Sequence, residues 1–234
     1  MNELVFASKN LNQFGLYVDS ANSWNKPLRT VTKVQIPGRS GDLVIDEGTF
    51  NNVTIAYRCF MMTNFVQNFT DLMAWLGSQP GYQRLEFTGD PQFYRMARIQ
   101  TDVNPTTTAF LRHGNFTLSF DCKPQRWLKI GEGWTEFNAS GAIYNPTHQV
   151  AHPIIRLYGT GTLQIGGVTI TVSTAGTSYI DIDTETMNAY EGSYSRNSNV
   201  SFSSYDQIGL NPGSNGLTIN SLTKVGIQPR WWEI

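Results

Sequence analysis

The chain of 234 residues is 40% hydrophobic and 15% charged, which is enough apolar material for buried cores and fits two modest domains better than one large one. Its 17 basic and 18 acidic residues give a formal net charge of −1, which excludes the strong positive field by which proteins hold nucleic acid or an anionic membrane. No run of about 18 apolar residues occurs and the first residues lack a signal-peptide pattern, so we expect neither a membrane span nor a secretion signal.

Two strands with many turn residues between them are the first clear elements. Residues 32–36 and 53–61 alternate apolar and polar side chains, which is the period of half-buried strands. In the intervening stretch VQIPGRSGDLVIDEGTF, Pro37 sets a kink, and glycines such as Gly38 and Gly41 supply backbone angles that other residues resist. We therefore predict a projecting loop over residues 37–47, with a local ion pair between Arg39 and Asp42.

The glycines of this loop raise the alternative of a phosphate cradle. A phosphate loop needs a lysine followed by serine or threonine at the start of a helix, whereas Asp42, Asp46 and Glu47 stand here. We therefore interpret the loop as a structural element and expect no nucleotide site.

One helix is predicted near residues 64–77, in the segment TNFVQNFTDLMAWLGSQPG. Apolar residues recur at helical spacing on one face, and Gly77, Pro80 and Gly81 end the run. The residues of this face are Phe65, Phe69, Leu72, Met73 and Leu76.

Three further strands complete the first predicted domain, residues 1–130. RLEFTGDPQFYRMARI predicts two strands around a turn at Gly89, Asp90 and Pro91, and GNFTLSFDCKP predicts one that Pro124 ends. The only cysteines, Cys59 and Cys122, fall in apolar series of predicted strands, and no histidine stands near either at zinc-ligand spacing. Buried free thiols are the favoured interpretation, with a disulfide between the two as the alternative.

The second predicted domain, residues 131–234, is rich in turns and shows no helical pattern. Periodicity is lost from about residue 131 to residue 150, so we place the domain junction there. In TLQIGGVTITV, a two-residue turn at Gly166–Gly167 would set Ile165 opposite Val168 and would give the hairpin one apolar face. Such strand pairs are typical of a β-sandwich.

The acidic run IDIDTETM is the strongest candidate for chemistry. Asp181, Asp183 and Glu185 share one face of a strand and would suit a metal ion or acid catalysis. The run lacks the glycine and spacing of a calcium loop, and its isoleucines alternate with the acids as in an ordinary strand. The three histidines, His113, His148 and His152, stand in no catalytic or metal-binding pattern. We therefore expect no catalytic residues, no cofactor and no metal.

The tail VGIQPRWWEI carries more apolar surface than a frayed end would show to water. Its own domain, the first domain or a neighbouring subunit could each cover it, and the sequence leaves these alternatives open, including a last strand that packs on the first domain.

Taken in order, the segments resemble one family, the distal tail proteins of bacteriophages with long non-contractile tails, also called siphophage tail-tip or baseplate hub proteins. The likeness spans nearly the whole chain. It rests on IPGRSGDL, LMAWLGSQPGYQRLEF, GDPQFYRMARI, GNFTLSFDCKP, NPTHQVAHPIIRLYGTGTLQIGGVTI, YIDIDTETMNAY and IQPRWWEI.

The resemblance implies a mainly β fold, with an N-terminal β domain carrying one packed α-helix and a C-terminal galectin-like β-sandwich. It implies a structural virion protein, not an enzyme, whose homo-hexameric ring joins the tail tube to baseplate or tail-tip proteins and leaves a channel for DNA. Expected partners are the major tail or tube protein and a tail-associated hub protein, with receptor-binding proteins as further candidates. DNA would pass without specific binding, and the protein would be assembled in the host cytoplasm and reside at the tail tip. The candidate assembly loop is Pro37, Gly38, Arg39, Gly41 and Asp42.

Two other functions compete with this one. A galectin-like sandwich binds sugar in other proteins, and Tyr190, Tyr194, Arg196, Asn197 and Asn199 could supply a sugar site, although the segment has the composition of an exposed polar loop. A cell-wall glycosidase using two of the three acids of the acidic run is the weakest alternative. Glycosidases hold their carboxylates across a cleft, whereas alternate residues of one strand point the same way.

Overall fold

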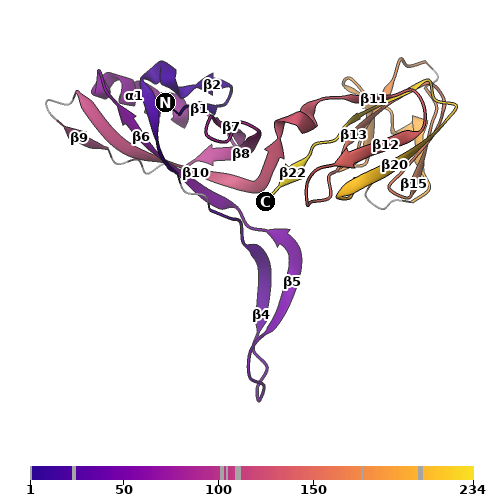
Figure 1. Cartoon of the computed structure of the whole chain (residues 1–234), viewed down its shortest axis with the longest axis horizontal. Coiled ribbons are helices and arrows are strands. Elements are labelled where there is room, and N and C mark those ends of the chain that lie inside the picture. The colour runs from indigo at the N-terminus through magenta and orange to yellow at the C-terminus, as the bar shows by residue number, and fades with distance from the viewer. Residues whose placement is uncertain are drawn as a thin grey trace. The chain divides into compact units, whose positions relative to one another are not determined.

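Figure 1 shows a computed structural model of the protein, in which residues 2–22, 25–100, 103, 105–108, 112–174, 176–204 and 208–234 are described. The chain divides into two compact units, residues 1–126 together with Ile234, and residues 127–233. No helix of the described residues is long and apolar enough to cross a membrane.

The first unit is built on an antiparallel sheet with the strand order β2-β1-β7-β8-β10-β6-β3, in which β9 and β22 also pair with β10. A short 3-10 helix, η1 (Leu11–Phe14), leads into β3. The strands are β1 (Leu4–Phe6), β2 (Lys9–Asn10), β3 (Leu16–Asn22), β6 (Val53–Met61), β7 (Gln83–Phe87), β8 (Phe93–Ile99), β9 (Thr106–Thr108) and β10 (His113–Leu128). The residues of β22 (Trp232–Glu233), although paired with β10, belong to the second unit. The predicted strand pair around residues 89–91 is confirmed as β7 and β8.

α1 (Phe65–Gly77) covers one face of this sheet, and it is the only α-helix among the described residues. Phe65, Leu72 and Leu76 are buried at the spacing that the sequence predicted, so the helix prediction is confirmed. Phe69 meets Phe116 of β10 edge to face, with ring centroids 5.1 Å apart. Helix and sheet thus bury their apolar faces against each other and form one core.

The β6–β10 ladder separates this core from an open face. Its register sets Phe116 opposite Cys59 and Cys122 opposite Val53, so the two cysteines lie at different levels of the ladder. Both thiols are free and buried, which decides between the two alternatives that the sequence left open. Burial raises the pKa of each thiol to about 12, so neither is a thiolate at neutral pH.

The hairpin of β4 (Arg29–Val34) and β5 (Leu43–Phe50) forms a separate two-stranded sheet. In Figure 1 it extends as a long ribbon away from the main sheet of the first unit. The predicted loop over residues 37–47 was therefore too long, because β5 begins at Leu43. Three adjacent apolar residues, Leu43, Val44 and Ile45, favour a strand despite the acidic residues beside them.

Two other expectations need correction. Pro124 does not end its strand, since β10 continues to Leu128: a proline is tolerated where its missing N–H is not needed, and its carbonyl here accepts a hydrogen bond from Arg95 at 3.1 Å. The stretch in which periodicity is lost also contains two strands, β11 (Thr135–Phe137) and β12 (Gly141–Asn145). Each lies at the edge of a sheet, where a strand has one neighbour and its sequence is less constrained.

The second unit is a sandwich of two antiparallel sheets, with orders β11-β21-β13-β16-β17-β18 and β12-β20-β14-β15-β19. The hairpin register predicted at Gly166–Gly167 is confirmed, with Ile165 opposite Val168 and the apolar face buried. Two 3-10 helices, η2 (Lys129–Glu132) and η3 (Asn197–Asn199), lie in its connections. The other strands are β13 (Ile154–Tyr158), β14 (Gly161–Ile165), β15 (Val168–Val172), β16 (Ile180–Asp183), β17 (Asn188–Glu191), β18 (Tyr194–Ser195), β19 (Val200–Phe202), β20 (Gly213–Asn220) and β21 (Lys224–Gln228).

The two tryptophans of the apolar tail are covered within the second unit. Trp231 is 5% exposed and belongs to the core of the sandwich. Its carbonyl accepts a hydrogen bond from the Leu128 N–H at 2.9 Å, and the Trp232 indole donates to the Val150 carbonyl at 2.9 Å. A Cβ on Gly131 would lie 2.5 Å from the Trp231 nitrogen, so only glycine allows this close approach. These contacts account for the two tryptophans at the end of the sequence.

We expect both cysteines to resist thiol reagents in the folded protein, because burial disfavours the reactive thiolate. Titration with 5,5′-dithiobis(2-nitrobenzoate) at pH 8 should show no fast-reacting thiol in the native protein and two in urea. A stoichiometric fast reaction of the native protein would contradict the burial of Cys59 and Cys122.

Candidate functional site

The β4–β5 hairpin is the most exposed regular element of the first unit. Its register sets Val34 opposite Leu43 and Thr32 opposite Ile45, so these four side chains share one face. Val34, Leu43 and Ile45 are 40%, 41% and 49% exposed. We call these three residues the apolar stripe. A two-stranded hairpin is marginally stable alone.

Polar contacts hold the base of the hairpin together. Arg29 of β4 forms an ion pair with Asp46 of β5, and the Thr32 hydroxyl donates to Glu47 at 2.8 Å. The Gly48 N–H and the Arg29 guanidinium hold the pKa of Asp46 below its usual value. All of these groups are exposed, so the pairs align the strands but contribute little stability.

The predicted assembly loop forms the tip of this hairpin. Pro37, Gly38, Arg39, Gly41 and Asp42 lie between β4 and β5, and the Arg39 N–H closes a turn on the Ile36 carbonyl at 3.1 Å. Within the described tip, residues 35–42, no Arg39–Asp42 ion pair forms. The predicted pair is therefore wrong, and the ion pair of this hairpin is instead Arg29–Asp46. The tip side chains are left exposed.

The face of the main sheet opposite α1 is open and polar. Along β6 and β10 the outward residues include Arg58, Asn115 and Thr117, all exposed, and a shallow hollow lies among them. At one end of this face Arg98 donates to Asp121 at 2.8 Å. Burial alone would raise the pKa of Asp121, but bonds from Arg98 and from neighbouring polar groups outweigh it and lower that pKa. The face is thus polar, with charges of both signs.

The acidic run of the second unit is neutralised by arginines. Asp181 accepts two hydrogen bonds from Arg156, at 2.6 and 2.8 Å, and the guanidinium also lies over the rings of Trp134 and Tyr179. Asp183 pairs with Arg230 at 2.7 Å, and the same guanidinium lies 3.6 Å from Glu185. In the described ranges no group of three His, Cys, Asp or Glu side chains is arranged to hold a metal. The run therefore forms a structural ion-pair row on the sandwich.

Two of the histidines and several of the candidate sugar residues are already bonded within the chain. His148 pairs with Glu233 at 3.2 Å, and the His152 ring bonds the Ile208 carbonyl at 3.0 Å. In the candidate sugar segment Arg196 pairs with Glu191, and the side-chain oxygen Oδ1 of Asn197 accepts a hydrogen bond from the Ala189 N–H. These polar groups stabilise their own loop, so the geometry gives sugar binding no support.

Solved structures share the fold of this chain. The SPP1 Dit protein (gp 19.1), described as a paradigm of the hub adsorption apparatus in phages that infect Gram-positive bacteria, matches over 100% of both chains with a TM-score of 0.70 and 12% sequence identity. The chain has the Dit fold. Chains of the phage P2 baseplate in its activated conformation match over 97% of both chains at 12% identity, with TM-scores of 0.51 for the structure with Sr and 0.49 for that with Ca. No protein-family model and no curated protein sequence matches the chain.

The Dit fold confirms the predicted fold class, a β domain with one packed helix followed by a β-sandwich. Sequence reasoning located the tip residues but missed the apolar stripe beside them. The run Leu43, Val44 and Ile45 was the available signal, because three adjacent apolar residues in a hairpin place apolar groups on both of its faces.

We expect Asp181→Asn to destabilise the sandwich by roughly 1–3 kcal/mol, because Asp181 is 5% exposed and its loss leaves Arg156 without a carboxylate. Urea denaturation would measure the change. Glu136→Gln, which breaks the exposed pair with Lys224, is the control and should cost less than about 0.5 kcal/mol. Equal stability of the two variants would contradict a structural role for the Asp181 pair.

Proposed function

We propose that this protein is a distal tail hub of a phage with a long non-contractile tail. In this proposal six copies form a ring that joins the tail tube to baseplate or tail-tip proteins and leaves a channel for DNA. The observation that carries the proposal is the match to the SPP1 Dit protein over the whole of both chains, since it includes both units in the same order.

The apolar stripe supports assembly into a ring. In the single chain Val34, Leu43 and Ile45 are each 40–49% exposed, and burying the rest of such side chains stabilises a contact by about 1 kcal/mol each. The hairpin is joined to the rest of its unit at one end, so it can reach a neighbouring copy without a change in the core. We infer that the stripe packs on the next subunit around the ring.

The open face of the main sheet supports a channel. A wall that DNA passes must be polar, yet it must not make the many phosphate contacts that hold nucleic acid. Arg58 and Arg98 on this face are accompanied by Asp19 and Asp121, which limits its positive field. We infer that this face lines the channel and that DNA passes without specific binding.

A structural role accounts for the charged groups of the second unit better than catalysis does. Asp181 and Asp183, the candidate acids of the glycosidase alternative, are each bound to an arginine. An acid or nucleophile of a glycosidase must be free to reach a glycosidic bond. We infer that the protein is not an enzyme, that it resides in the virion tail, and that tube and tail-tip proteins are its partners.

The oligomeric state tests both the hub and the stripe. Native mass spectrometry of the purified protein should show six copies. Leu43→Thr combined with Ile45→Thr should shift the population to smaller species, because both substitutions remove apolar area from the stripe and keep a β-branched residue in the strand. The melting temperature of the dissociated chain should not change, since the stripe is exposed there.

Val44→Thr is the matched control, because Val44 is 54% exposed and lies on the opposite face of the same strand. It should leave the hexamer in place. A chain that is monomeric at all concentrations, alone and with tail-tube protein as a template, would overturn the hub proposal. A hexamer that tolerates the double substitution would overturn only the role of the stripe.

The tip of the hairpin is tested by charge reversal. Arg39→Glu and Asp42→Lys, made singly, should weaken assembly, because both side chains are exposed and free to pair with a neighbouring ring or subunit. The effect should grow at low ionic strength, as expected for exposed charges. Sedimentation velocity at two salt concentrations measures it, and unchanged assembly in both variants would remove these residues from the contact.

A further inference from the structure

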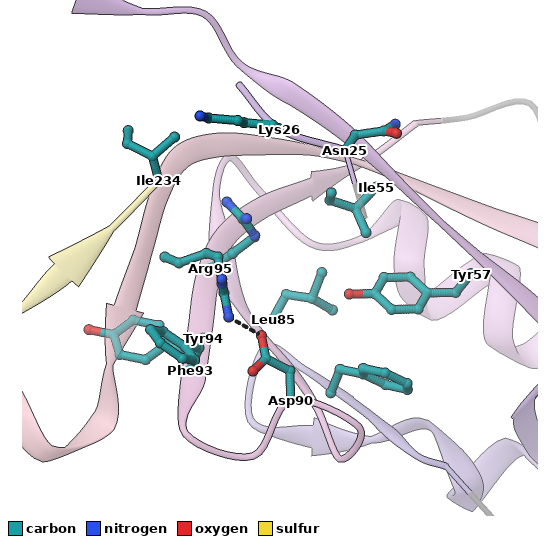
Figure 2. A pocket seen from close by; sticks show the side chains of 12 residues that line it. Asn25, Lys26, Ile55, Tyr57, Leu85, Asp90, Phe93, Tyr94, Arg95 and Ile234 are labelled. Atoms are coloured by element: carbon teal, nitrogen blue, oxygen red, sulfur yellow. Dashed lines mark hydrogen bonds and ion pairs between the residues drawn. The ribbon is translucent and has the colours of Figure 1, made fainter. Parts of the chain in front are cut away.

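The first unit contains a cavity of about 210 Å³ that none of the functions considered so far uses. It lies on the face of the sheet that α1 covers, beside the inward residues of β6, β7 and β8 (Figure 2). Ile55, Leu85 and Phe87 form an apolar wall. The polar lining residues include Lys26, Tyr57, Asp90, Arg95 and Arg126.

Tyr57 is buried but its hydroxyl has no partner. The residue is 6% exposed, and its ring packs against Phe87 and Phe120 with centroids 5.3 and 6.0 Å away. Among the described residues nothing hydrogen-bonds the hydroxyl, which points into the cavity in Figure 2. Burial raises the pKa of Tyr57, so the hydroxyl keeps its proton and is a donor. The hydroxyl faces the open cavity, where an acceptor on a ligand would pair with it.

Arg95 is the second donor without a matching acceptor. One of its N–H groups donates to the Pro124 carbonyl at 3.1 Å, but across the described ranges no carboxylate lies within ion-pair distance of it. The nearby Asp90 is already taken, since it pairs with Arg126 at 2.9 Å, and Arg126 in turn stacks on Phe93. The remaining N–H groups of Arg95 are therefore available to the cavity.

We propose that this cavity binds a carboxylate attached to a small apolar group. Arg95 and the Tyr57 hydroxyl would bind the carboxylate oxygens, while Leu85 and Phe87 contact the apolar group. Asp90 is already paired with Arg126, so the guanidinium of Arg95 and the ammonium group of Lys26 are the lining groups that favour an anion. The volume suits about one aromatic ring with its substituent, since an engineered cavity of about 150 Å³ holds benzene.

Two sources could supply this chemistry, a free organic acid and the terminal carboxylate of a partner protein. Both present a carboxylate next to an apolar group. The inference stands on the geometry of the first unit and does not depend on ring assembly, so a failed hexamer experiment leaves it intact.

Ligand-observed ¹⁹F NMR on the full chain tests the site with 4-fluorobenzoate. The neutral isostere 4-fluorobenzamide is the reference, because it has the same shape without the charge. The benzoate signal should broaden on adding protein and should recover when unlabelled benzoate competes, and its affinity should exceed that of the amide at least tenfold. Equal affinities, or no binding of the benzoate at 10 millimolar, would overturn the proposal.

Three variants assign the binding to this cavity. Arg95→Gln should abolish benzoate binding, and Tyr57→Phe should weaken it about tenfold, as expected for one hydrogen bond to a charged group. Tyr57→Phe removes a hydroxyl without a partner, so the core should fold normally. Arg98→Gln is the matched control, because Arg98 lies on the same strand, on the open face, and should bind benzoate as the unaltered protein does. Benzoate binding that Tyr57→Phe and Arg95→Gln leave unchanged would overturn the assignment.

Peptides distinguish the two sources. A five-residue peptide that ends in phenylalanine with a free carboxylate is compared with the same peptide amidated at its end. Tighter binding of the free-acid peptide than of benzoate would support a partner chain end, whereas binding of benzoate alone would support a small organic acid.

Discussion

The pairing of β6 with β10 is the constraint on which the first unit depends. Because its register is fixed over nine residue pairs, every second side chain of both strands faces α1 and the others face away. Phe116, Leu118 and Phe120 are nearly inaccessible, and each contributes about 1.5–3 kcal/mol of apolar burial. A slip of one residue would put these side chains in water and charged ones in the core. The alternation of inward and outward side chains along β6 and β10 thus specifies the core, the open polar face and the position of Tyr57 at the cavity.

The same alternation explains why the hairpin behaves differently. β4 and β5 pair only with each other, and among the described residues no other layer of the first unit covers either of their faces. Their apolar residues therefore remain exposed in the single chain, although their β-branched side chains are suited to a strand. In the proposed ring, a neighbouring copy would supply the surface that buries them, because every subunit carries the same surface.

Sequence patterns predicted the elements whose apolar residues repeat within one segment. The helix at Phe65–Gly77 and the hairpin at Gly166–Gly167 belong to this class, because helical spacing and a two-residue glycine turn are local signals. The strands β11 and β12 were missed because edge strands bury few of their side chains. The cavity could not have been found from the sequence, since Tyr57 and Arg95 belong to different strands and meet only through the sheet.

The two units differ in how their acidic side chains and arginines are paired. In the sandwich Asp181 and Asp183 each form an ion pair with an arginine, so these two carboxylates are already bound. In the first unit Asp90, which lies beside the cavity, is bound to Arg126. Among the described residues no carboxylate pairs with Arg95, whose one hydrogen bond there goes to the Pro124 carbonyl. The two acids of the sandwich therefore serve its structure, whereas the proposed site of the first unit depends on donors that face an open cavity.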